Sequence, residues 1–564
     1  MTRITPAGKP SANGPGNTND DSTIQVPPLL IAVALPIIGI LGFFVRVLPY
    51  EGTSAILGGF YPNAFVGMDF ILRNGHILAN GDLPVSSTFS QGIYYGTSDI
   101  FLFIFTTMAA IIGGAGDSQS LAQFLRGFVW LGTILFPLSV VFVFNSFAKA
   151  AGVRLRAATL MMAFALGTFL GWNVIYLSSA GEANAPYGWS LILIVVGLLV
   201  RPSQHVTVTR GLALGFASLS MTFYHTDAAV IFLVLLSWLV VQRRAGKRSL
   251  TVGMLACYTA AYLAYLLYVS VSFFGAYLSA LAASSQTLFG GATHVLQSPG
   301  VFSIPLWWRL PLIASWAIVG GTYGTFLLML RRRPKRTPGL VAASALIVAF
   351  PPIFVTFALF GLVEALGRIT LYGFVFFVPV LAYLRTHFDG RRTAHGVAAV
   401  SLSILLLSGG LFVTTPTFAS NTISYPEESA GLWLIGHSDS STVVFTDYRL
   451  GSILTSNGWF SVIGLWSSDP PSKVLGALDA IYYGNSSEAA QSALAGYTSF
   501  SGHRPSFVFL STGMSDSNIG ISAGGVTFSA APRDFSAKFN QNPNFAVVFD
   551  SGEAKVYMIE TPGW

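Results

Sequence analysis

The 564-residue chain is 53% apolar and only 9% charged, and its mean hydropathy is +0.63. Soluble domains carry about 25% charged residues, so this composition excludes an ordinary soluble enzyme and indicates a membrane protein. The pI near 9.4 invites a nucleic-acid partner, but the basic residues are dispersed over loops and form no basic patch interleaved with aromatic residues. We therefore expect no nucleic-acid partner.

Residues 1–27 are rich in Gly, Pro, Asn, Thr and Ser, which predicts a disordered cytoplasmic tail. The first apolar run, residues 28–49, is long enough to span a membrane and is followed by no convincing cleavage site. It is predicted to be a retained first helix, with the N-terminus in the cytoplasm.

Further apolar runs continue to residue 414. They cover residues 99–114, 125–147, 157–177, 187–200, 211–224, 227–242, 249–272, 309–330, 339–361, 369–384 and 394–414. Most of the 30 Lys and Arg residues lie in short stretches between these runs, which is the positive-inside pattern of a polytopic membrane protein. The stretches are the N-terminal tail, 148–156, 201–210, 242–248, 331–336 and 385–392. They predict which loops face the cytoplasm of a plasma-membrane protein.

Counting from these basic loops places the start of the 125–147 run outside, where the first helix already ends. The 99–114 run therefore has no room to cross and is predicted to be re-entrant or interfacial, which leaves about 11 transmembrane helices. We expect a transmembrane domain over 28–414 with two long external loops, 50–124 and 273–308.

After residue 415 the sequence changes character, because more than half of the 23 acidic residues lie there and the apolar runs shorten. Residues 415–564 are predicted to form a soluble extracytoplasmic α/β domain. Its expected strands are residues 442–447, 505–512, 545–550 and 554–560, with a hairpin turn at Ser551 and Gly552 and helices near 472–484 and 487–497.

Polar residues on the predicted external side are candidates for function, because a carboxylate at a membrane boundary is costly unless water, a partner or a ligand satisfies it. Glu51 follows the first helix and suits a general base or metal ligand, or is a solvated loop acid. Asp69 lies in an amphipathic segment and has the same options, or pairs with Arg73 at i, i+4.

His225 and Asp227 occupy the external junction between two closely spaced helices. They suit proton transfer, metal binding or sugar recognition, whereas an N-cap is the structural alternative for Asp227. Arg368 stands at the outer end of an apolar helix, where a guanidinium suits a phosphate headgroup, and a pair with Glu364 is its structural alternative.

The layout resembles the GT-C superfamily of membrane glycosyltransferases. The resemblance covers the order of helices, external loops and C-terminal domain, and it is motif-level in YPNAFVGMDFILRNGHILANGDLP (residues 61–84), at Arg368 and at His225. Asn63 stands where that loop pattern has Asp, and Asn184, with Glu182 nearby, stands where a second acidic motif has Asp. The WWDYG signature of oligosaccharyltransferases is absent from the sequence.

The resemblance implies an inverting transfer of a sugar from a polyprenyl-phosphate donor to an extracytoplasmic acceptor, which is a glycan, lipid or protein. Glu51 or Asp69 is the implied catalytic base, and Arg368, His225, Asp227, Glu182 and Asn63 are implied to bind substrate. A divalent cation, Mg²⁺ or Mn²⁺, accompanies some donors of this superfamily. The alternatives are a non-catalytic scaffold or accessory subunit of cell-envelope glycan assembly, which Asn63 and Asn184 favour, and a transporter.

Overall fold

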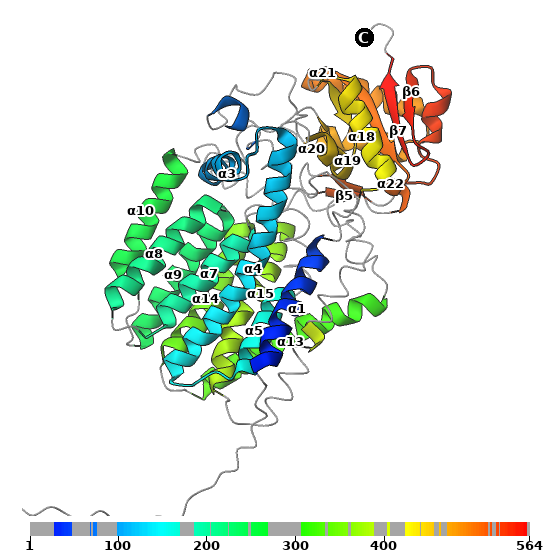
Figure 1. The fold of residues 1–564 in the computed structure, drawn as a ribbon. Helices are drawn as coiled ribbons and strands as arrows, with labels where there is room; N and C mark the ends of the chain where they lie inside the picture. Colours follow the sequence, from blue (N-terminus) through cyan, green and yellow to red (C-terminus); the bar gives the residue numbers. More distant parts are fainter. Residues whose placement is uncertain are drawn as a thin grey trace, which may run out of the picture.

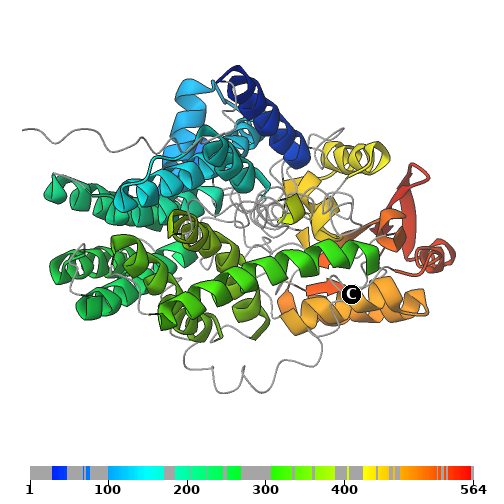
Figure 2. The same ribbon diagram turned by 90° about the horizontal axis from the view of Figure 1, so that it is seen from below.

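The computed structural model describes the greater part of the chain. The described residues are 28–47, 68, 71–75, 99–169, 185–202, 205–223, 225–245, 250–268, 306–332, 337–358, 362–387, 403–405, 423–439, 442–455, 462–463, 471–502, 504–516, 519–521, 526–528 and 531–560. They form a helical bundle and an α/β part at one end of it (Figure 1). Viewed from below, the α/β part, coloured yellow to red, lies to one side of the bundle (Figure 2).

The helices of the bundle follow the apolar runs of the sequence closely. They are α1 (Pro28–Val47), α4 (Ser118–Ala151), α5 (Ala157–Phe169), α7 (Ala185–Val200), α8 (Val206–Phe223), α9 (His225–Ala245), α10 (Val252–Tyr268), α13 (Leu306–Arg331), α14 (Pro338–Ala358) and α15 (Leu362–His387). The predicted run 394–414 is described only at residues 403–405. The described apolar runs form helices because a helix pairs the N–H and C=O groups of its interior with one another, where lipid offers no partner.

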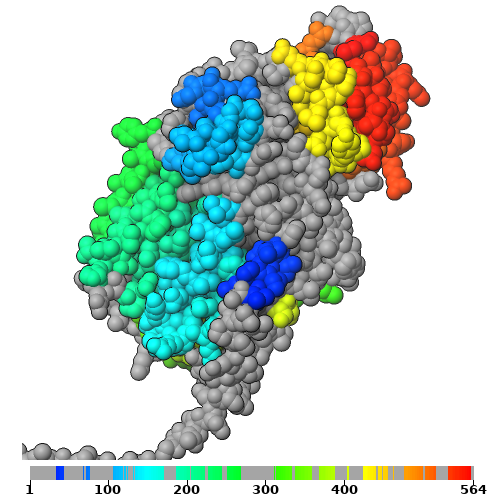
Figure 3. Space-filling view, in the orientation of Figure 1, coloured from blue at the N-terminus to red at the C-terminus, as the bar shows by residue number. Residues whose placement is uncertain are grey.

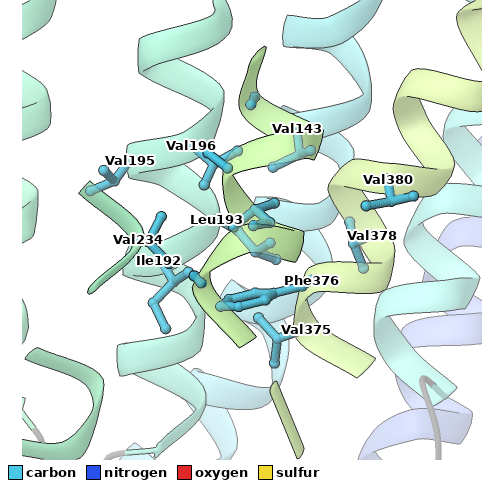
Figure 4. Close-up of a cluster of buried hydrophobic side chains, with 14 of the residues drawn as sticks. Val143, Ile192, Leu193, Val195, Val196, Val234, Val375, Phe376, Val378 and Val380 are labelled. Atoms are coloured by element: carbon cyan, nitrogen blue, oxygen red, sulfur yellow. The ribbon is translucent and has the colours of Figure 1, made fainter. Parts of the chain in front are cut away.

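Aliphatic and aromatic side chains from several helices form the centre of the bundle (Figure 4). Val143 of α4, Leu193 of α7 and Val234 of α9 are buried there with Phe376 of α15. Helices α5 and α4 lie close together at a glycine. A Cβ on Gly167 of α5 would lie 2.6 Å from the backbone of Pro137 in α4. This packing makes α4, α7, α9, α14 and α15 a rigid frame for side chains at its ends.

The structure is that of a membrane protein. In its described part, five helices are long and apolar enough to cross a membrane: Ile134–Ala151, Thr226–Arg243, Ile313–Arg331, Pro338–Ala358 and Arg368–His387. Shorter apolar helices cover Val33–Gly42, Ala157–Phe169, Pro186–Val200 and Val252–Tyr268. α1 lies on the surface, and its Val33, Ile37 and Leu41 are about half exposed (Figure 3). Such an apolar outer face suits contact with lipid.

Helix α3 (Asp99–Ile112) has a different orientation. Figure 1 shows it nearly end-on, so it runs crosswise to the bundle helices. Its terminal Ile111 and Ile112 are 77% and 74% exposed, and Thr106 donates a hydrogen bond to the carbonyl of Met68. A crosswise helix is the arrangement expected of a segment that does not cross, as the parity of the basic loops predicts for residues 99–114.

The α/β part contains a five-stranded sheet of order β2-β1-β3-β7-β6. Its strands are β1 (Val443–Phe445), β2 (Val462–Ile463), β3 (Pro505–Ser511), β6 (Phe545–Asp550) and β7 (Ala554–Ile559). β1 pairs in parallel with β2 and β3, whereas β7 is antiparallel to both β3 and β6. Four of these strands lie where the sequence predicts strands, and the turn between β6 and β7 contains Gly552 at a φ of 85°.

Helices and a small second sheet complete this part. The helices are α18 (Tyr425–His437), α19 (Tyr448–Thr455), α20 (Pro471–Tyr483), α21 (Ser487–Ser501), the short α22 (Gly513–Asp516) and the 3-10 helix η3 (Ala537–Gln541). β4 (Ile519–Ile521) and β5 (Val526–Phe528) form the two-stranded antiparallel sheet. α20 and α21 agree with the two helices predicted from the sequence.

A buried ionic cluster joins α18 to the carboxyl ends of β1 and β3. Arg449 Nη1 donates to Glu427 Oε2 at 2.7 Å, and its Nη2 donates to Ser511 Oγ at 3.1 Å. Arg449 Nε also lies 3.5 Å from Asp447 Oδ2. Glu427 and Asp447 are each 2% exposed and Arg449 is 5% exposed, so both carboxylates depend on this one guanidinium.

The N-terminus of α18 is fixed twice. Ser424 caps it through a reciprocal capping box with Glu427. Ser424 Oγ also donates to Glu553 Oε2 at 3.0 Å, which ties the helix to the β6–β7 turn. The start of the α/β part is therefore bonded to the β6–β7 hairpin, although 129 residues separate Ser424 from Glu553 in the sequence.

Candidate functional site

Polar side chains from several helices converge around Asp227, in the first turn of α9. Asp227 is completely buried, and its Oδ1 accepts a 2.6 Å hydrogen bond from the hydroxyl of Tyr372 in α15. Tyr258 of α10 donates a 2.9 Å hydrogen bond to the carbonyl of Ala228, the next residue of α9. Three helices are thus joined by polar contacts inside an otherwise apolar bundle.

Helix α7 closes this cluster on another side. A Cβ on Gly188 would lie 1.7 Å from Asp227 Oδ2, so only glycine leaves room for the carboxylate there. The neighbouring Trp189 is fully buried, and its indole N–H has no hydrogen-bond partner among the residues that the structure describes. We call Asp227, Tyr372, Tyr258, Gly188 and Trp189 the Asp227 cluster.

Arg368 lies one helical turn before Tyr372 on α15, at i, i+4, and the two side chains therefore share a face of the helix. The Arg368 guanidinium and the Asp227 carboxylate both act electrostatically on the Tyr372 hydroxyl. Arg368 also lies over the ring of Phe357 in α14, 5.9 Å from its centroid, and is only partly buried. A partly exposed guanidinium beside a buried acid suits a phosphate-bearing ligand.

The Asp227 cluster and the basic ends of the same helices lie far apart. Arg243 and Arg244 are in the last turns of α9, and Arg385 is in the last turn of α15. At 1.5 Å per residue, about 25 Å separate Arg368 from Arg385 along the helix. The polar cluster and the cytoplasmic charges predicted from the sequence therefore occupy opposite ends of the bundle.

The structure brings together two of the residues singled out from the sequence, Arg368 and Asp227. Because α9 begins at His225, Asp227 is the third residue of the helix, and its carboxylate turns inward to Tyr372. The interpretation of Asp227 as an N-cap is therefore wrong. His225 opens α9, but its side chain lies outside the described part, as does that of Glu364.

The remaining predicted site residues lie outside the described residues: Glu51, Asn63, Asp69, Glu182 and Asn184. Asp69 falls between two described positions, Met68 and Ile71, whose side chains are 0% and 5% exposed. The helical turn that follows ends at Gly75, where φ is 75°. The described neighbours of Asp69 thus pack inward against the protein.

Sequence reasoning missed Tyr372, Tyr258 and Gly188. Tyr372 carried a usable signal, since it stands four residues after Arg368 and is thereby placed on the same helix face. Tyr258 and Gly188 carried none, because their roles depend on which helices are neighbours. Among the residues that the structure describes, no group of three or more His, Cys, Asp or Glu side chains could hold a metal ion.

The helical bundle, the crosswise helix and the α/β part together give the chain a fold similar to that of a solved archaeal oligosaccharyltransferase. The structure of the Archaeoglobus fulgidus oligosaccharyltransferase tethered with an acceptor peptide aligns with 86% of this chain and 70% of its own, with a TM-score of 0.54 and 11% identity. Its complex with zinc and sulfate aligns with 86% and 68%, with a TM-score of 0.52 and 12% identity.

ArnT from Cupriavidus metallidurans bound to undecaprenyl phosphate aligns with 94% of this chain and 98% of its own, with a TM-score of 0.46 and 13% identity. No protein-family model matches the sequence. No curated protein matches it either.

Proposed function

We propose that the chain is a membrane glycosyltransferase that transfers a sugar from a polyprenyl-phosphate-linked donor to an extracytoplasmic acceptor. The observation that carries the proposal is Arg368, a partly exposed guanidinium beside the buried Asp227 cluster within a fold shared with the archaeal oligosaccharyltransferase. A complex of that neighbour contains dolichol-phosphate, a ligand of the chemistry that Arg368 would bind. The transmembrane domain would cover 28–414, with the N-terminus in the cytoplasm and residues 415–564 outside.

The proposed reaction is a single inverting displacement. An acceptor hydroxyl oxygen attacks the anomeric carbon, and the bond between that carbon and the phosphate oxygen breaks. The hydroxyl proton goes to Glu51 or Asp69, and the electron pair leaves with the polyprenyl phosphate. Arg368 stabilises the negative charge that develops on the leaving phosphate, which is where a fixed cation lowers the barrier most. His225, Glu182 and Asn63 would line the substrate side.

A divalent cation would serve a pyrophosphate-linked donor by neutralising charge on the leaving group. The acids suited to holding one, Glu51, Asp69 and Glu182, lie outside the described residues, and the described part offers no three-residue metal site.

The test is release of polyprenyl phosphate from a radiolabelled polyprenyl-phosphate hexose in membranes that contain the protein. Wild-type membranes should release it, and Arg368→Ala should lower the rate by about a hundredfold, the usual effect of removing one transition-state donor. Either Glu51→Gln or Asp69→Asn should abolish release, which would identify the base.

Arg385→Ala is the matched control, because it removes the same side chain from the opposite end of α15. It should leave release unchanged. If no donor is turned over by the wild type, the chain is a non-catalytic scaffold or accessory subunit. If turnover survives all three substitutions, the site is elsewhere.

A further inference from the structure

The Asp227 carboxylate is buried where an acid is expensive. Asp227 is 0% exposed and lies among helices that are otherwise apolar. A carboxylate in such a place must be compensated by fixed polar partners, and intramembrane acids of this kind usually serve function. The hydrogen bond of 2.6 Å from Tyr372 is the compensation that the structure shows most directly.

Surrounding contacts define where that carboxylate lies. Gly188 of α7 provides the space, since any Cβ there would overlap Asp227 Oδ2. Tyr258 fixes the α9 backbone at the next residue through its bond to the carbonyl of Ala228. The acid is therefore a fixed anchor for Tyr372. Together with the 2.6 Å hydrogen bond from Tyr323 of α13 to the carbonyl of Gly373, it sets the position and rotation of α15.

Arg368 depends on the same rotation of α15. About one helical turn separates Arg368 from Tyr372. The hydrogen bond that fixes the Tyr372 side chain therefore also fixes the part of α15 that carries Arg368. The ring of Phe357 supports the guanidinium from α14, at 5.9 Å. The rotation of α15 therefore decides which face of the helix the Arg368 side chain leaves from, and the ring of Phe357 limits where its guanidinium can lie.

We propose that Asp227 is a positioning residue, which acts through Tyr372 to hold Arg368 in the orientation that binds the phosphate of a polyprenyl phosphate. This inference rests on the proposed function of Arg368. In this role Asp227 does not touch the reacting atoms and acts through the hydrogen bond that it accepts from Tyr372.

The experiment measures binding of undecaprenyl phosphate to the purified full-length protein in detergent, with undecaprenol as the ligand that lacks phosphate. Tyr372→Phe should weaken binding of the phosphate by about tenfold, the usual effect of losing one hydrogen bond to a charged group. It should leave undecaprenol binding unchanged. Asp227→Asn should remain within about threefold of the wild type, because its amide oxygen still accepts from Tyr372.

Coupling to Arg368 separates positioning from a general loss of stability. In protein that already carries Arg368→Ala, the Tyr372→Phe change should have no further effect on phosphate binding. Tyr383→Phe is the matched control: it removes a mostly buried hydroxyl from the same helix about three turns further on, and should change nothing.

Two failures are distinguishable. If Arg368→Ala weakens phosphate binding but Tyr372→Phe does not, or if the two effects simply multiply, Asp227 does not position Arg368 and the proposed function survives. If the wild type binds undecaprenol and its phosphate equally, the phosphate site is refuted together with the positioning role.

Discussion

The hydroxyl of Tyr372 donates a 2.6 Å hydrogen bond to Oδ1 of Asp227, although 145 residues separate the two in sequence. This bond joins the first turn of α9 to the third turn of α15, inside a bundle whose other contacts are mainly apolar. Tyr372 thus contacts the acid Asp227 directly, and it lies on the same face of α15 as the cation of Arg368.

Gly188→Ala should destabilise the protein by about 1–3 kcal/mol, the usual cost of overpacking a well-filled interior. The added methyl would lie 1.7 Å from Asp227 Oδ2 and 2.7 Å from its Cγ, so the carboxylate must move away from Tyr372. Thermal unfolding of the protein in detergent measures the loss.

Gly320→Ala in α13 is the control, because nothing lies within 4 Å of a Cβ at that position. Alanine is the better helix former, and the control should be neutral or slightly stabilising. Equal losses in the two variants would show that α7 does not pack against Asp227 as described.

Arg449→Met should destabilise the α/β part by about 3–5 kcal/mol, because it leaves Glu427 and Asp447 buried without their shared cation. Hydrogen exchange of β1 and β3 in the full-length protein reports the change. Lys555→Met is the comparison: its ion pair with Asp550 is 3.1 Å long but partly exposed, and should contribute less than about 1 kcal/mol. Similar exchange in both variants would contradict a special role for the buried cluster.

Acid should remove the contribution of Glu427. Burial alone would raise the pKa of Glu427, but the Arg449 guanidinium, together with Ser511 and the Ser424 N–H, lowers it below its ordinary value. The stabilisation is therefore complete above the unfolded pKa of about 4.3 and is lost as the pH falls through the lower folded pKa.

The difference in stability between wild type and Glu427→Gln should accordingly be constant near neutral pH and shrink below about pH 4.3. Burial raises the pKa of Asp447, whose contribution has the opposite sign, and subtracting the variant from the wild type reduces that background. A difference that grows on acidification would contradict the lowered pKa of Glu427. Hydrogen exchange of β1 at several pH values, corrected for intrinsic rates, measures it.

Ser424→Ala should cost about 0.5–2 kcal/mol, the range for loss of an N-cap. The serine closes the capping box of α18 and also donates to Glu553, so exchange should increase both in α18 and at the β6–β7 turn. Ser499→Ala is the control, because that exposed serine only donates to a carbonyl within its own helix. Increased exchange confined to α18 would show that the bond to Glu553 contributes nothing.

The sequence predicts the positions of the bundle helices closely, because hydropathy and basic loops depend on residue composition alone. The run 369–384 lies within α15, and the crosswise helix α3 covers most of the 99–114 run. The longer strands were also predictable, since β3, β6 and β7 each have five or more residues of strand composition. β1, although only three residues long, lies within the predicted strand 442–447, whereas β2, β4 and β5 were not predicted from the sequence.

The candidate site was predictable only in part. Arg368 and Asp227 stand out as charges beside apolar runs, but their connection requires the neighbouring positions of α9 and α15. Asp227 near a helix start was also compatible with an N-cap, and only the inward contact with Tyr372 separates these interpretations. The ionic cluster could not be predicted from the sequence either, because Glu427 and Arg449 belong to different helices and meet only in the folded structure.

The position of β7 has a consequence for how the α/β part is assembled. β7 follows all other strands of its sheet in the sequence, yet it lies between β3 and β6 and pairs with both. Until residues 554–559 have paired, β3 has an unpaired edge and β6 has no partner in this sheet. Such edges invite association with other chains. The sheet is thus completed by the insertion of an inner strand, which covers the edge of β3 and joins β6 to the rest of the sheet.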